Sequence, residues 1–76
     1  MNPDAALDAA LLAAHAAADG PALARLYREA GEKRLSEGKI NAGCFYLVQA
    51  YIFALDCGAD DIPEIHAILV AHGREA

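Results

Sequence analysis

The chain has 76 residues, a formal net charge of −5 and a hydrophobic fraction of 57 %. This length leaves room for a single domain over residues 1–76, and the apolar content excludes a disordered tail. An acidic chain lacks the strongly basic surface that neutralises phosphates, so we expect no nucleic-acid partner. Chains this short usually need a disulfide, a bound metal, a partner or a second subunit to be stable.

The composition predicts an all-α protein, because alanine supplies 19 residues and threonine and tryptophan are absent. Glycine and proline divide the chain into four predicted helices, at about residues 3–18, 21–37, 40–56 and 62–72. We expect Asn2 to cap the first helix. Asp61 and Glu64 have the spacing of a capping box at the start of the last.

The predicted helices differ in how much apolar surface they carry. The first has one narrow stripe made by Leu7, Leu11 and Leu12. The third is apolar on nearly every face, and a helix of that kind must be surrounded. We therefore expect it to be covered by the three other helices, by a second subunit, or by both. The second helix is expected to bury Leu23, Leu26, Tyr27, Ala30 and Leu35.

Residues 27–50 resemble a tetratricopeptide (TPR) repeat, in which an aromatic residue, a glycine and spaced small and large residues mark a pair of antiparallel helices. The matching positions are Tyr27, Ala30, Gly31, Gly38, Ile40, Gly43, Leu47 and Ala50. Gly31 and Gly43 would let the two helix backbones approach closely. Weaker matches on either side suggest two flanking half-repeats, which gives a short α-solenoid of four helices. A Sel1-like repeat and an unrelated four-helix bundle are the alternatives.

The sequence offers no clear site for chemistry. His66 and His72 are six residues apart and point to different faces of a helix, so we expect no metal site. Cys44 and Cys57 lie in or at the end of the most apolar segment and are expected to be core thiols. No glycine-rich phosphate loop is present. We expect no catalytic residues, no cofactor and no enzyme activity.

The sequence also bears on location. The first residues lack the basic segment of a secretory signal. The longest apolar run, residues 42–55, is shorter than the ~20 residues of a membrane helix. We expect a cytoplasmic protein with no membrane partner.

The expected function is a non-catalytic protein–protein interaction module or adaptor. In the TPR family the first helices of each pair line a groove that holds a peptide or a partner helix. The resemblance places six residues there, and its arginines would select acidic groups of a peptide. These groove residues are Arg25, Arg28, Glu32, Leu35, Ala67 and Val70.

A second hypothesis is a self-assembling structural homodimer without a peptide ligand. The aromatic residues of the third helix cannot all face one core, because they spread around most of its circumference. A surplus of exposed aromatic side chains is typical of residues that anchor a second subunit. The residues expected to take part are Phe45, Tyr46, Tyr51 and Phe53.

Overall fold

In a computed structural model, which describes residues 3–75 and the side chains of residues 5–75, the chain is all-helical. The described part contains α1 (Pro3–Ala16), α2 (Gly20–Ser36), α3 (Ile40–Cys57) and α4 (Ile62–Ala71). Each boundary lies within two residues of the expected one. The expected cap Asn2 lies outside the described residues.

The connection between α1 and α2 is a hydrogen-bonded turn over residues 17–19. α1 ends at Ala16, and Ala18 takes a left-handed conformation with φ 51°. The Asp19 amide then donates a hydrogen bond to the Ala14 carbonyl at 2.9 Å, the closing bond of a Schellman motif. The Asp19 carboxylate accepts a hydrogen bond from the Ala22 amide at 3.1 Å and so caps α2. One aspartate therefore links the two helices.

We expect Ala18→Gly to raise the free energy of unfolding by about 1 kcal/mol, because a left-handed conformation costs an L-residue about that much and glycine much less. Urea denaturation followed by circular dichroism measures the change. Ala13→Gly is the matched control, since Ala13 is an exposed residue inside α1. That substitution should lower stability by about 1 kcal/mol. Destabilisation of both variants would contradict the left-handed conformation of Ala18.

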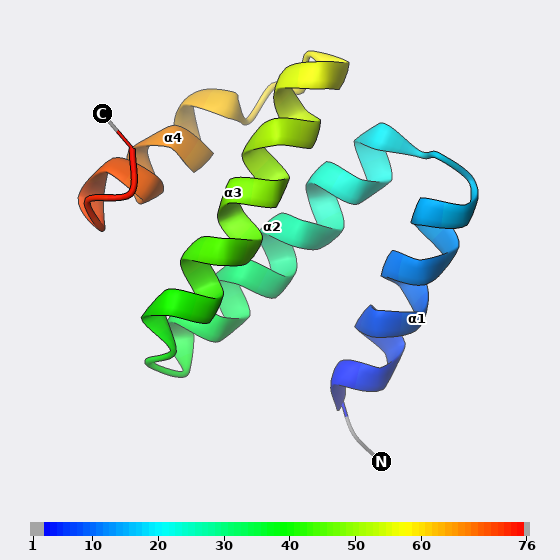
Figure 1. Cartoon of the computed structure of the whole chain (residues 1–76), viewed down its shortest axis with the longest axis horizontal. Helices are drawn as coiled ribbons and strands as arrows, with labels where there is room; N and C mark the ends of the chain where they lie inside the picture. The colour runs from blue at the N-terminus through cyan, green and yellow to red at the C-terminus, as the bar shows by residue number, and fades with distance from the viewer. Residues whose placement is uncertain (1–2, 76) are drawn as a thin grey trace.

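The four helices follow one another in space in the order in which they occur in the chain (Figure 1). α2 and α3 form an antiparallel hairpin with the most extensive contact, α1 lies against α2, and α4 lies against α3. The hairpin turns at Gly38, which has φ 78°, as its expected role in ending the second helix requires. The Cα atoms span 32 × 30 × 15 Å, so the molecule is flat.

The predicted close approach of α2 and α3 is confirmed at Gly31 and Gly43. A Cβ atom at Gly31 would lie 2.7 Å from Cγ of Leu47 and 3.0 Å from the Gly43 carbonyl oxygen. A Cβ atom at Gly43 would lie 2.7 Å from Leu35 and 3.0 Å from the Gly31 carbonyl oxygen. Only hydrogen fits at these two positions. The glycines therefore set the distance between the two backbones.

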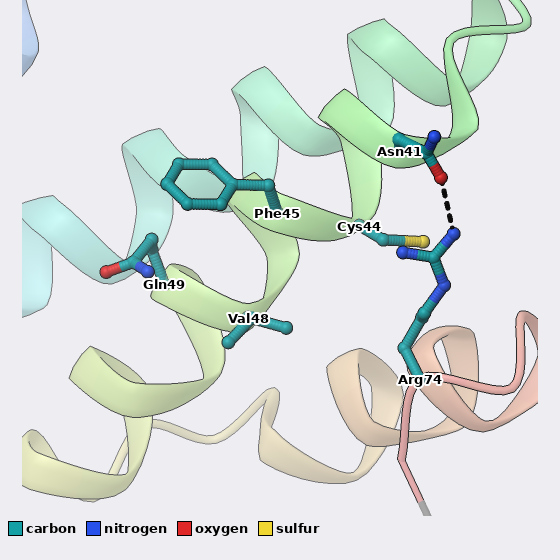
Figure 2. A pocket seen from close by; sticks show the side chains of 6 residues that line it. All are labelled: Asn41, Cys44, Phe45, Val48, Gln49 and Arg74. Atoms are coloured by element: carbon teal, nitrogen blue, oxygen red, sulfur yellow. Dashed lines mark hydrogen bonds between the residues drawn. The ribbon is translucent and has the colours of Figure 1, made fainter.

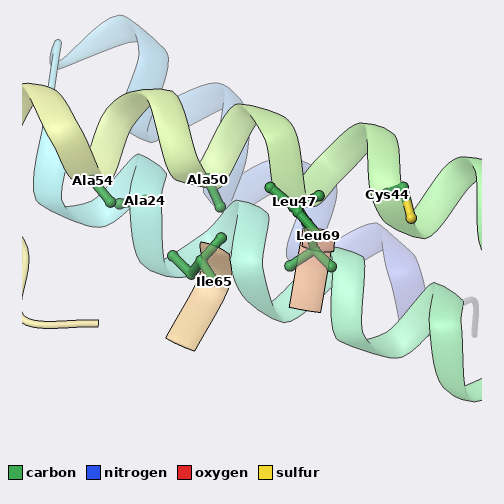
Figure 3. Packing of buried hydrophobic residues seen from close by; sticks show 7 residues of the cluster. All are labelled: Ala24, Cys44, Leu47, Ala50, Ala54, Ile65 and Leu69. Carbon is green, nitrogen blue, oxygen red and sulfur yellow. The ribbon is translucent and has the colours of Figure 1, made fainter. Parts of the chain in front are cut away.

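The core lies where α4 packs on this hairpin (Figure 3). Leu47, Ile65 and Leu69 are fully buried, and alanines surround them. Small residues let α2 and α3 pack closely, while the larger side chains of α4 fill the space beside them. The cluster consists of Ala24, Cys44, Leu47, Ala50, Ala54, Ile65 and Leu69.

The apolar stripe expected on α1 is covered unevenly, with Leu7 and Leu11 half-buried and Leu12 exposed. Leu12 is 71 % exposed, whereas Ala14 is the residue that α1 buries most deeply. Leu26 of α2 is only half-buried. The physical reason is that α1 lies against α2 along one side only, so a leucine elsewhere on its circumference has no neighbouring helix to cover it.

The chain's own helices do not surround α3, so of the expected alternatives cover by this chain alone is excluded and cover by a second subunit stays a prediction. Phe45, Ile52 and Leu55 are 61 %, 46 % and 52 % exposed, because α2 and α4 cover other faces of the helix. By length and composition α3 is also apolar enough to cross a membrane. Its buried face nevertheless packs on α2 as a core helix does. The absence of a membrane partner stays a prediction.

Candidate interaction surfaces

Arg28 joins α2 to the start of α4. Its Nε donates to Glu32 at 2.8 Å, and its Nη1 lies 2.9 Å from a carboxylate oxygen of both Asp61 and Glu64. The hydrogen bonds to Glu32 and then to Asp61 raise the pKa of Arg28 above its ordinary value. Charge-assisted bonds of this kind are the strong ones. The Arg28 side chain, 23 % exposed, is therefore held by three carboxylates.

These ion pairs correct the predicted capping box. Asp61 is the N-cap residue of α4, yet its side chain makes no capping hydrogen bond to the helix. Its carboxylate and that of Glu64 both turn to Arg28 instead. The reason is electrostatic, since a guanidinium attracts a carboxylate more strongly than a neutral backbone amide does.

We expect Arg28→Met to lower the free energy of unfolding by about 1.5 kcal/mol, because the substitution removes charged hydrogen bonds that tie α4 to the hairpin. The raised pKa means that Arg28 itself loses its charge only as the pH rises above the ordinary arginine pKa. Salt is therefore the practical test. Urea denaturation in 1 M NaCl should shrink the difference from the unsubstituted protein, since charges are screened within about 3 Å.

Arg25→Met is the matched control for this measurement. Arg25 is an exposed arginine of the same helix. Its substitution should change stability by less than about 0.5 kcal/mol. Equal effects at both arginines would contradict the role given to Arg28.

The six predicted groove residues do not line one groove. Arg28 is held by carboxylates, and Leu35 packs against Gly43 inside the hairpin. Ala67 and Val70 are exposed and lie on the side of α4 away from buried Ile65. Of the other two residues, Glu32 bonds to Arg28 and Arg25 lies beside α1.

Two adjoining hollows run between α1 and α2, with volumes of about 260 and 330 Å³. Both are lined by Ala10 and Leu26, and further alanines of α1 form much of their floor. Arg25, Glu29 and Lys33 stand among the lining residues. Arg25 was predicted to lie in a groove with α4. In the structure it lies on a shallow surface with α1.

Aromatic side chains from three helices meet beside the hairpin. The Tyr27 ring stacks on Phe53, with ring centres 5.8 Å apart and an angle of 3° between the planes, and it also stacks on Tyr46 at 6.1 Å. His15 of α1 meets Tyr27 and Phe53 edge-on, and its Nε2 lies 2.8 Å from the Tyr27 hydroxyl. Aromatic pairs of this geometry stabilise the fold. Tyr46 and Phe53 are thus partly covered by their own chain.

The other two predicted self-association residues lie elsewhere on α3. Tyr51 is half-buried and packs on His66 of α4, with ring centres 5.7 Å apart. Phe45 touches Tyr46 edge-on and is otherwise exposed. The four aromatics therefore do not share one face, and Phe45 is the one with most of its ring in solvent.

A groove of about 470 Å³ lies between α3 and the residues that follow α4 (Figure 2). Arg74 reaches across to the first turn of α3, where its Nη2 donates a hydrogen bond to Oδ1 of Asn41 at 2.6 Å. Phe45, Val48 and Gln49 continue the lining along α3. The groove is open and joins the exposed apolar surface of the helix.

We define the α3 stripe as the exposed Phe45, Ile52 and Leu55 together with Val48, which is half-buried against the core. These residues follow one another at three- or four-residue spacing and so lie on one side of α3. The opposite side carries the buried residues, such as Gly43, Leu47 and Ala50. Sequence reasoning named Phe45 as an exposed residue but missed Val48, Ile52 and Leu55, because it followed the aromatic side chains alone. The available signal was the three- or four-residue spacing of large apolar residues on the side of α3 opposite Gly43.

The expected absence of catalytic and metal chemistry stays a prediction. Over residues 3–75, no group of three histidine, cysteine, aspartate or glutamate side chains is placed to hold a metal ion. Cys44 is buried as expected, but Cys57 is exposed. Cys57 is the last residue of α3, and its exposure shows that its prediction as a core thiol was wrong.

Comparison with protein-family models, with curated proteins and with solved structures found no match. The functional reading of the chain therefore depends on its own surfaces.

Proposed function

We propose that this protein is a small non-catalytic interaction module that binds another protein through the α3 stripe. The observation that carries the proposal is the exposure of Phe45, Ile52 and Leu55 on one helix of an otherwise packed hairpin. Contiguous apolar side chains on the surface of a small domain mark an interaction site. The groove beside Arg74 adds a concave edge and a cation to that surface.

A TPR-like arrangement is part of the proposal. Its support is the hairpin of α2 and α3, with close approach at Gly31 and Gly43 and helices α1 and α4 on either side. An adaptor role in the cytoplasm is consistent with such a module and belongs to the same proposal. The docking surface differs from the one the resemblance implied, since Arg28 is already held by carboxylates.

A photo-crosslinking amino acid placed at residue 52 tests the proposal in cells that express the protein. We expect covalent adducts with protein at this position, because Ile52 lies in the middle of the α3 stripe. The matched position is Ala67, which is exposed on the outer side of α4 and belonged to the groove expected from the sequence. Mass spectrometry then shows whether an adduct contains this chain or another.

The two positions separate the outcomes. Adducts at position 67 and none at position 52 would show that the sequence-based groove is the docking surface and the α3 stripe is not. The absence of adducts at both positions would overturn the interaction function itself.

A further inference from the structure

The face of α3 that carries the stripe has a nearly symmetrical arrangement of residues. Its midpoint lies between Val48 and Gln49. At equal distances from that midpoint stand Phe45 and Ile52, which are both large, apolar and exposed. Successive steps of three or four residues keep all of these positions on one side of the helix. Such a face matches a second copy of itself when the two run in opposite directions.

The charges at the two ends of this face are opposite. Asn41, at one end, holds the guanidinium of Arg74 through the 2.6 Å hydrogen bond. Asp56 lies at the other end, as far from the midpoint as Asn41 is. Among the side chains of residues 5–75, neither Arg74 nor Asp56 takes part in an ion pair. The two ends of this face therefore carry charges of opposite sign, Arg74 at one end and Asp56 at the other, and neither charge has an ion-pair partner within the described part of the chain.

We propose that the α3 stripe binds a second copy of this chain, with the two α3 helices antiparallel about a twofold axis near Val48 and Gln49. The proposal rests on the proposed function, since it names the partner of the same surface. In this arrangement Phe45 packs on the partner's Ile52, and Arg74 faces the partner's Asp56. A twofold axis repeats every contact, so each pair forms twice.

The opposite orientation is disfavoured by charge. A parallel pair of α3 helices would bring Arg74 next to the partner's Arg74 and Asp56 next to the partner's Asp56, and like charges in contact repel. The antiparallel pair also sets the positive end of each helix dipole beside the negative end of the other. Both effects select the same orientation.

A dimer interface of ordinary size would take up a minor part of the molecular surface. A stable interface buries about 800 Å² on each partner, which is less than a fifth of the 4499 Å² that this chain exposes. The core of the interface consists of the few side chains of the stripe. We therefore expect a dissociation constant on the order of micromolar, as area alone does not give tight binding.

Sedimentation velocity over a dilution series from about 1 µM to 1 mM is the first test, since this range spans micromolar affinity. The unsubstituted chain should pass from monomer to dimer. Ile52→Asp should raise the dissociation constant by at least about 100-fold, because it buries a charge at the centre of the interface. Leu12→Asp is the matched control, an exposed leucine on α1 that should leave the dissociation constant within about threefold.

A charge exchange tests the orientation. Arg74→Asp or Asp56→Arg alone should each raise the dissociation constant by about tenfold, since each creates a contact between like charges. The double variant restores opposite charges across the axis and should return to within about threefold of the original value. Both residues are exposed, so this series tests the pairing even if Ile52→Asp disturbs the fold.

Three results would overturn the proposal: a monomer at 1 mM, an equal loss of dimer for Leu12→Asp and Ile52→Asp, or a double charge variant as weak as the single ones. A monomer that nevertheless forms crosslinks to other proteins at position 52 would remove the second copy as partner and leave the proposed function standing.

Discussion

Gly31→Ala is expected to lower the free energy of unfolding by about 2 kcal/mol, even though alanine is the better helix former. The new Cβ atom would lie 2.7 Å from Cγ of Leu47 and 3.0 Å from the Gly43 carbonyl oxygen. Leu47 is fully buried and the carbonyl belongs to the backbone of α3, so neither can move aside without separating the helices. Urea denaturation at one fixed protein concentration measures the loss.

Two other glycines provide graded controls for this result. Gly20 begins α2, and the nearest atom to an added Cβ lies 3.9 Å away, so Gly20→Ala should be neutral or slightly stabilising. Gly43→Ala should cost less than Gly31→Ala, because its main clash is with the half-buried side chain of Leu35. An equal cost at positions 20 and 31 would contradict the close approach of α2 and α3.

Much of the hairpin could be predicted from the sequence because local rules determine it. Glycine ends helices in a left-handed conformation, and Gly38 and Gly58 do so with φ 78° and 67°. The close approach of the two helices was predicted at Gly31 and Gly43 from the resemblance to a TPR repeat. These features depend on neighbouring residues and on one pair of helices.

The surfaces could not be predicted in the same way, because exposure depends on where every other helix lies. Ile52 and Leu47 are similar apolar residues five positions apart on α3, yet one is 46 % exposed and the other fully buried. The sequence predicted that Arg28 binds a ligand. In the structure Arg28 pairs instead with Asp61 and Glu64, at the start of α4. Charge partners from distant parts of the chain leave no local sequence signal.

The two faces of α3 therefore have separate roles. One face, through Leu47 and Ala50, holds the hairpin and α4 together in the core. The other, the α3 stripe, exposes the apolar side chains of Phe45, Ile52 and Leu55. A substitution on the first face should act on folding, and one on the second should act on association. This separation makes the two sets of experiments independent.

Leu47→Ala should lower the free energy of unfolding by about 3 kcal/mol, because it leaves a cavity at the centre of the core. Leu47 is fully buried and belongs to the same cluster as Ile65 and Leu69 (Figure 3). The control is Leu12→Ala, where the leucine is 71 % exposed and the cost should stay below about 0.5 kcal/mol. An added osmolyte such as trimethylamine N-oxide keeps the weakest variants folded.

Combining Leu47→Ala with Gly31→Ala gives the sharpest test of the core. Removing Cγ of Leu47 removes the 2.7 Å clash, so the added methyl at position 31 enters the space that the leucine leaves. The double variant should be more stable than the sum of the two single losses by about 1–2 kcal/mol. Simple additivity would mean that the two residues do not touch, and the distance between α2 and α3 described above would be wrong.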